Sequence, residues 1–274
     1  MIRTILAATL YGTLALQAAN LPELTETRWS GSWIGHEQNR FAYSIEAKNG
    51  RARLVPKVRG KDGYVPAGVH DKFDIYFILE EMKDGKWTRL KMEPDGFETG
   101  QAASADVKAC EFVATYAGGS KARIRHRFER NKIVLSTALE HQAAEHPMRV
   151  GVLILTPAIY QVENFKKVPD EKEIEKMMED DEVRAVRTDG KSFKFELHEQ
   201  VVLSDEKLLG AGATEFSIET KRYGGDPIRF AAARKDGGKI EFRQSKRLYQ
   251  MFAATWYPPE GKAPANGAEL VIGF

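Results

Sequence analysis

The sequence predicts an all-β protein, a large antiparallel β-sandwich, and two observations carry this prediction. First, Asn-Gly, Asp-Gly and Gly-Gly pairs recur along the chain, and such pairs favour the positive φ angles of tight turns between antiparallel strands. They stand at 49–50, 62–63, 84–85, 95–96, 118–119, 189–190, 224–225 and 236–237. Second, many of the segments between them alternate apolar and polar residues with the period of two expected of a half-buried strand.

The clearest strand covers 121–129, where one face is charged and the other is apolar apart from a histidine. The apolar face consists of Ala122, Ile124, His126 and Phe128. A turn at 130–131 leads into a second alternating run over 133–139, so we expect a hairpin with one buried face. Further strands are expected at 40–46 paired with 51–58, at 73–82 paired with 86–92, at 192–197 and at 240–242.

One segment breaks the strand pattern. Ile174, Met177 and Met178 fall at i, i+3 and i+4, and acidic residues collect at the start of the segment, so the sequence predicts one short amphipathic helix near 170–181. This divides the chain into four parts, although a single large domain fits the pattern equally well. The parts are a signal peptide at 1–19, a first β-sandwich half at 20–162, a helical connection at 163–182 and a second β-sandwich half at 183–274.

Short similarities leave open whether the two halves are duplicated. Residues 43–48 resemble 216–221, and residues 112–116 resemble 252–256, in the same order along the chain. The two offsets differ, so a duplication would require an insertion or deletion between the matches.

The first 19 residues have the composition of a secretory signal peptide. Arg3 precedes an uncharged, largely apolar run from Thr4 to Ala19 that ends in small residues, which predicts cleavage near Ala18 or Ala19. The run is about 16 residues long, shorter than the roughly 20 that a membrane-spanning helix needs. We therefore expect a soluble, secreted or periplasmic protein without stable membrane insertion after cleavage; an uncleaved membrane anchor is the alternative.

Cys110 is the only cysteine, so the chain cannot form an internal disulfide and depends on its core for stability. Its strand-like surroundings predict a buried, unreactive thiol. The formal net charge is +2, from 41 basic and 39 acidic residues. This balance lacks the basic excess of nucleic-acid-binding domains, so no nucleic-acid partner is expected. No known ligand spacing or nucleotide motif occurs, and we expect neither a metal nor a cofactor.

Three residues are candidates for acid–base chemistry: His126, His141 and Glu145. His126 lies on the apolar face of its strand, where it is either a neutral core histidine or a catalytic base that needs a carboxylate from another strand. His141 and Glu145 follow the strand at 133–139, and they form either a polar loop or a metal or acid–base site. Neither matches a known hydrolase or metalloprotease motif.

Two sets of residues are candidates for ligand binding. Arg123, Arg125 and Arg127 stand about 7 Å apart on the charged face of their strand. Guanidinium groups suit carboxylates and sulfates, so this face predicts an acidic glycan, with ion pairs across the hairpin as the alternative. Aromatic rings that stack on sugars or pack in the core form the second set, which is Trp29, Trp33, Trp256 and Tyr257.

Export and the predicted sandwich favour a non-catalytic binding protein for acidic or neutral glycans or for other envelope components. Two alternatives remain. One is a carbohydrate-active enzyme of the glycoside hydrolase, lyase or mutarotase type, with a cleft of histidine and carboxylates that leaves little local signature. The other is an envelope assembly or structural protein that binds another protein through a sheet edge.

Overall fold

The computed structural model is an all-β structure, which confirms the predicted fold class. It describes residues 20–68, 71–157, 172, 176, 179, 181–196, 203, 205, 207–234, 237–244, 252–259 and 268–274. These contain 19 β-strands and two short 3-10 helices, η1 (Thr27–Trp29) and η2 (Lys221–Tyr223). The helix predicted near 170–181 lies mostly outside the described residues, although Lys172 and Lys176 are helical.

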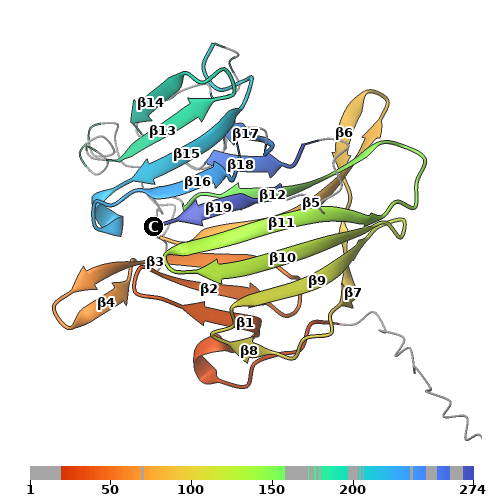
Figure 1. Cartoon of the computed structure of the whole chain (residues 1–274), viewed down its shortest axis with the longest axis horizontal. Coiled ribbons are helices and arrows are strands. Elements are labelled where there is room, and N and C mark those ends of the chain that lie inside the picture. The colour runs from red at the N-terminus through yellow and green to blue at the C-terminus, as the bar shows by residue number, and fades with distance from the viewer. Residues whose placement is uncertain are drawn as a thin grey trace, which may run out of the picture.

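The strands form two layers (Figure 1). In the first, neighbours follow the order β8, β1, β2, β3, β5, β12, β18, β17, and all pairs are antiparallel except β8 with β1. The strands of this layer are β8 (Ser104–Ala105), β1 (Ser32–Glu37), β2 (Phe41–Glu46), β3 (Ala52–Gly60), β5 (Phe73–Lys83), β12 (Met148–Leu155), β18 (Phe252–Tyr257) and β17 (Lys239–Gln244). Two short strands extend it as hairpins, β4 (Gly63–Pro66) from β3 and β6 (Lys86–Arg89) from β5.

The second layer is antiparallel throughout. Its order is β7, β9, β10, β11, β19, β16, β15, β13, β14. The strands are β7 (Met92–Glu98), β9 (Ala109–Tyr116), β10 (Lys121–Glu129), β11 (Lys132–His141), β19 (Leu270–Gly273), β16 (Ile228–Ala232), β15 (Ala213–Glu219), β13 (Glu182–Arg187) and β14 (Ser192–Glu196).

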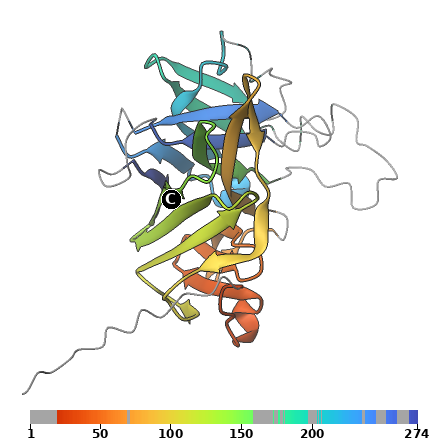
Figure 2. The same ribbon diagram turned by 90° about the vertical axis from the view of Figure 1, so that its right-hand side faces the viewer.

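Both layers belong to one curled sheet. Ala213 of β15 pairs with Ile240 of β17, which joins the layers at one edge. β12 lies between β5 and β18, and β19 lies between β11 and β16, so strands from distant parts of the chain are neighbours in each layer. Figure 2 shows the red and yellow-green strands lying below the teal and blue ones, while the orange-gold strands of the β5–β6 hairpin rise beside the latter. The domain boundary at 163–182 stays a prediction.

The turn dipeptides produce the predicted hairpins. β10 pairs with β11 from Glu129 opposite Lys132, and Asn131 in the turn has φ +55°. β5 pairs with β6 across Asp84 and Gly85, which have φ +50° and +73°. Left-handed backbone of this kind is tolerated by Asn and Asp and is unstrained for Gly, which is why these residues stand there.

Aromatic side chains fill the space between the layers. Trp33 of β1 and Phe77 of β5 contact Phe112 of β9 edge-on, with centroid distances of 5.8 and 5.9 Å. Further along the chain, Phe216 of β15 stacks on Phe230 of β16 at 4.6 Å. The buried residues of both regions form one continuous apolar cluster, which supplies the stability that no disulfide provides.

Two observations concern the environment of the chain. Within the described ranges, no helix has the length and apolar character needed to cross a membrane. The Cys110 thiol is buried, and this burial raises its pKa to about 12. The thiol is therefore protonated and unreactive at neutral pH, as its strand context predicts. The predicted signal peptide at 1–19 lies outside the described residues.

Candidate functional site

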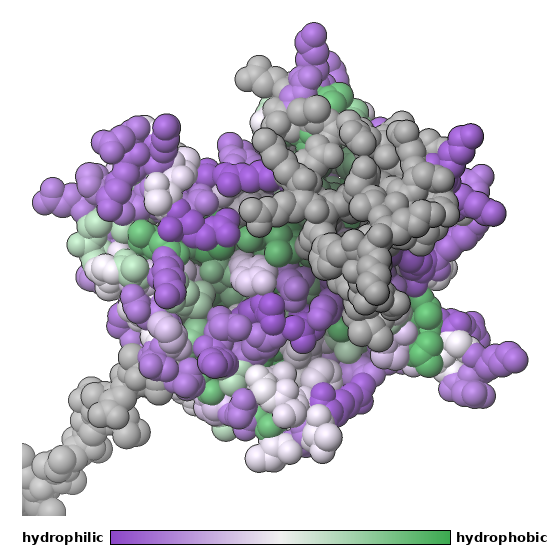
Figure 3. All heavy atoms as spheres, turned by 180° about the vertical axis from the view of Figure 1, so that it is seen from behind, coloured by the Kyte–Doolittle hydropathy of each residue, from purple (hydrophilic) through white to green (hydrophobic). Residues whose placement is uncertain are grey.

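The outer face of the first layer carries a polar cluster that is separate from the core. Alternation along β5 points Tyr76, Ile78 and Glu80 away from the second layer, and Arg149 of β12 stands directly opposite Glu80. Figure 3 shows this back face, on which apolar residues lie between hydrophilic ones.

Gly151 on β12 makes room for an aromatic ring from the next strand. A Cβ at Gly151 would lie 2.9 Å from two ring carbons of Tyr257 on β18. The ring therefore rests against the backbone of β12, and its hydroxyl donates a hydrogen bond of 2.9 Å to Oε2 of Glu80. Because Gly151 has no side chain, the ring of Tyr257 lies across β12, and its hydroxyl reaches Glu80 on β5.

The guanidinium of Arg149 lies close to two aromatic rings. Its Cζ is 3.8 Å from the ring centroid of Tyr257 and 4.4 Å from that of Trp87. Both rings therefore lie within cation–π distance of the guanidinium. Such contacts attract a cation to the negative faces of the rings, and they orient the group. We call this arrangement the Arg149 slot.

Glu80 and Glu241 hold the edges of the guanidinium. Nε of Arg149 donates to Oε2 of Glu80 at 2.9 Å, and Nη2 lies 2.9 Å from the same oxygen. Nη1 lies 3.7 Å from Oε1 of Glu241, whose nearer partner is Lys239 at 2.8 Å. Burial, and then the adjacent charge of Glu80, raise the pKa of the Tyr257 hydroxyl, so this group stays protonated as a donor.

An open cleft of about 720 Å³ surrounds the slot, and we call it the Arg149 cleft. Trp87, Pro258 and Pro259 provide its apolar wall, and Lys86 and Arg243 are exposed on its rim. Neither rim cation pairs with a carboxylate among the described residues. The cleft therefore combines an apolar wall with unneutralised positive charge.

Substituting Gly151 with alanine is expected to push the ring of Tyr257 off β12. The new methyl group overlaps the ring and also lies 3.1 Å from the Trp256 carbonyl oxygen, so we expect a loss of roughly 1–3 kcal/mol in the free energy of unfolding. Urea denaturation measures this loss. Gly273→Ala is the matched control, because no atom lies within 4 Å of a Cβ at that position. Equal stability of the two variants would contradict the proposed packing.

The chain matches no known protein family. A search of curated proteins likewise finds no sequence of significant similarity. Support for a function therefore comes from the contacts of the residues that line the cleft.

Arg123, Arg125 and Arg127 project from the outer face of β10, as the alternation predicts, and each is paired with glutamates. The partners are Glu111 and Glu140 for Arg123, Glu111 for Arg125, and Glu129 and Glu269 for Arg127. These pairs resemble the cross-strand ion pairs that the sequence left open as the alternative. A glycan-binding role for the three arginines stays a prediction.

The four predicted aromatic residues lie in different environments. Trp33 and Trp256 are completely buried in the core, where each indole N–H donates to a backbone carbonyl. Trp29 is half-buried, and its ring covers Gly35, where a Cβ would overlap it. Tyr257 alone of the four lines the Arg149 cleft.

His126 lies in the core with 1 % of its surface exposed. The rings of Tyr43 and Phe77 lie 5.8 and 5.3 Å from it, and neither of its ring nitrogens has a hydrogen-bond partner among the described residues. Burial lowers the pKa of His126 to about 3, so the imidazole is neutral. This geometry corresponds to the neutral core histidine that the sequence left open.

His141 and Glu145 are both exposed near the end of β11, away from His126. Nε2 of Gln142 donates to the carbonyl oxygens of Ala144 and His146, which shapes the loop between them. His126 stands opposite Leu135, so about 20 Å of strand separates its position from His141. The structure does not bring the three candidate catalytic residues together.

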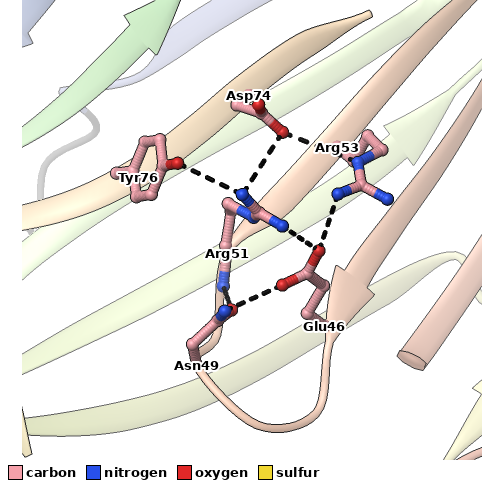
Figure 4. Close-up of polar contacts among 6 residues, drawn as sticks. All are labelled: Glu46, Asn49, Arg51, Arg53, Asp74 and Tyr76. Atoms are coloured by element: carbon pink, nitrogen blue, oxygen red, sulfur yellow. Dashed lines mark hydrogen bonds and ion pairs between the residues drawn. The ribbon is translucent and has the colours of Figure 1, made fainter. Parts of the chain in front are cut away.

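A second polar cluster on the outer face ties the first hairpin to β5 (Figure 4). Nη2 of Arg53 donates to Glu46 at 2.9 Å, and its Nε lies 3.5 Å from Asp74. Arg51 also pairs with Glu46 and donates to the hydroxyl of Tyr76 at 3.2 Å. The two arginines and two carboxylates neutralise one another, so this cluster stabilises the sheet and lacks the free charge of the Arg149 cleft.

Glu80, Trp87 and Arg149 were not predicted from the sequence as site residues. One signal was present: Glu80 and Glu81 interrupt an otherwise apolar strand, and glutamates inside such a strand are normally paired. Their partner could not be identified, because Arg149 lies far along the chain and reaches Glu80 only through the pairing of β5 with β12.

Proposed function

We propose that the chain is an exported, non-catalytic binding protein for acidic glycans, and that the Arg149 cleft holds the ligand. One observation carries the proposal: the Arg149 guanidinium, close to the rings of Trp87 and Tyr257, lines a cleft whose rim cations, Lys86 and Arg243, pair with no carboxylate among the described residues. Such cations attract anionic groups. The prediction that the chain is exported depends on the signal-like sequence at 1–19.

The cleft also has the apolar surface that sugar rings require. Trp87 is half-buried, and Pro258 and Pro259 lie across the same cleft. The apolar faces of pyranose rings pack on such side chains, while charged groups at the edge fix the orientation of the ligand. An acidic polysaccharide offers both features in each repeating unit.

The carboxylates favour binding over hydrolysis. Glu80 is 3 % exposed and lies beneath Arg149 and Tyr257, which both direct hydrogen bonds to Oε2. A general acid must reach the proton-accepting atom of its substrate, and a carboxylate held in this way does not. Glu241 is then the only carboxylate among the described residues that line the cleft.

Reversing the rim charges is the direct test of this proposal. In the double variant Lys86→Glu/Arg243→Glu, affinity for polygalacturonate is expected to fall roughly a hundredfold at low salt, since each lost charge contact contributes about 1.5 kcal/mol. Both side chains are exposed, so the fold is not expected to change. Isothermal titration calorimetry measures the affinity, and thermal melting checks the fold.

Two comparisons make the result interpretable. The variant Arg123→Ala/Arg125→Ala/Arg127→Ala tests the arginine face of β10 with the same ligand, and we expect its affinity to stay unchanged. Neutral dextran is expected to bind more weakly than polygalacturonate. If the wild-type protein fails to bind any acidic polysaccharide, or if the rim variant binds as well as wild type, the proposed function is wrong.

A further inference from the structure

We propose that the Arg149 cleft binds a run of several acidic sugars that lies across the strands, and not a single sugar. This inference rests on the proposed function, because it specifies how much of an acidic polysaccharide the same cleft holds. It depends on where the unpaired cations of the cleft lie and on what lies between them.

The two rim cations lie at opposite ends of the cleft. Lys86 is on β6 and Arg243 is on β17, and β5, β12 and β18 lie between these two strands. Neighbouring strands are about 4.8 Å apart, so the four spacings separate β6 from β17 by about 19 Å along the sheet. The register also offsets the two cations along the strands, because Lys86 is level with the last residue of β5 and Arg243 with the second. One sugar ring is much smaller than this separation, so it cannot contact both cations.

Between the two ends, the charged side chains of the cleft pair with one another. Arg149 pairs with the buried Glu80, and Lys239 lies 2.8 Å from Glu241. Among the described residues that line the cleft, positive charge without a carboxylate partner therefore remains only at the two ends.

Apolar side chains line the part of the cleft between these charges. The ring centroid of Trp87 is 4.4 Å from Cζ of Arg149, and Pro258 and Pro259 directly follow β18. Sugar rings pack on such surfaces. Because a polyuronate carries a carboxylate on each ring, one run of sugars can place rings on the apolar part and carboxylates at both ends.

A ligand that reaches both ends gains from binding them together. Once one end is bound, contact at the other end is intramolecular, and each charge-assisted contact is worth roughly tenfold in affinity. A short ligand reaches one cation at a time and has two alternative places to bind. Removing one cation therefore costs a short ligand only about a factor of two, whereas a long ligand loses a whole contact.

The experiment measures how tightly the galacturonic acid trimer and octamer bind the wild-type protein, Lys86→Ala and Arg243→Ala, by calorimetry at one low ionic strength. We expect the octamer to bind the wild type at least about tenfold more tightly than the trimer does. In each variant, the affinity for the octamer is expected to fall about tenfold and that for the trimer about twofold at most. Both side chains are exposed, and thermal melting checks that the variants are folded.

Lys61→Ala is the matched control. Lys61 is an exposed lysine in the turn between β3 and β4, it has no carboxylate partner among the described residues, and it does not line the cleft. This variant is expected to bind both oligomers as the wild type does. Equal affinity of the wild type for trimer and octamer, or equal losses for the two oligomers in Lys86→Ala and Arg243→Ala, overturns the inference and leaves acidic-glycan binding intact. If neither the octamer nor polygalacturonate binds, the proposed function itself is wrong.

Discussion

The variant Arg149→Ala is expected to lose roughly 3–5 kcal/mol of unfolding free energy, because it leaves the charge of Glu80 buried without its cation. Glu80 is 3 % exposed, and Arg149 supplies two nitrogens at 2.9 Å from its Oε2. The hydrogen bond from Tyr257 remains, but one neutral donor does not compensate a buried carboxylate. Packing is lost as well, since the guanidinium contacts the rings of Tyr257 and Trp87.

A double variant distinguishes the charge effect from the packing effect. Arg149→Ala/Glu80→Ala removes the uncompensated carboxylate, so it is expected to be more stable than Arg149→Ala alone. Chemical denaturation of the wild type, both single variants and the double variant completes the cycle. Arg229→Ala is the control, since its exposed pair with Glu215 is expected to contribute no more than about 1 kcal/mol. Additive losses in the cycle would contradict the coupling of Glu80 with Arg149.

The variant His126→Leu is expected to be more stable than the wild-type protein, by about 1–3 kcal/mol at neutral pH. Within the part of the chain that the structure describes, both ring nitrogens of His126 are buried without hydrogen-bond partners, and an unsatisfied buried polar group costs approximately this much. The surrounding side chains are largely aromatic, so a leucine at this position would pack against apolar groups. Lower stability of the variant would show that the imidazole has a partner in solution.

The same substitution is expected to change how stability depends on pH. The pKa of His126 is about 3 in the folded chain, because burial disfavours the charged form, against 6.5 when exposed. Below about pH 6.5 the unfolded chain therefore binds a proton that the folded chain does not, and stability falls as the pH decreases. At about pH 4.5 the loss from this group is roughly 3 kcal/mol.

The measurement is the difference in unfolding free energy between His126→Leu and the wild type from pH 7 to pH 4.5. Carboxylates contribute equally to both proteins and cancel, so we expect the advantage of the variant to grow as the pH falls. His141→Leu is the control for replacing a histidine at an exposed site. A constant difference across this range would mean that His126 becomes protonated without unfolding.

The sequence by itself determined the fold class, the main hairpins and the inward face of each clear strand. These features depend on local chemistry. Turn residues such as Asn131 and Gly85 adopt positive φ angles, and the period of two along 121–129 places Ile124 and His126 inside. Neither feature requires knowledge of which strands lie next to one another.

Only the tertiary structure decided which side chains on the outer face of the sheet contact one another. Tyr257, Gly151 and Glu80 come from three strands that are distant in the sequence, and the register of β5, β12 and β18 brings them together. Side-chain alternation predicts the face on which a residue lies, but the pairing of strands far apart in the chain is decided by the packing of the whole core. The Arg149 slot was for this reason absent from the sequence prediction, although Glu80 and Trp87 lie on a hairpin that the pattern anticipates.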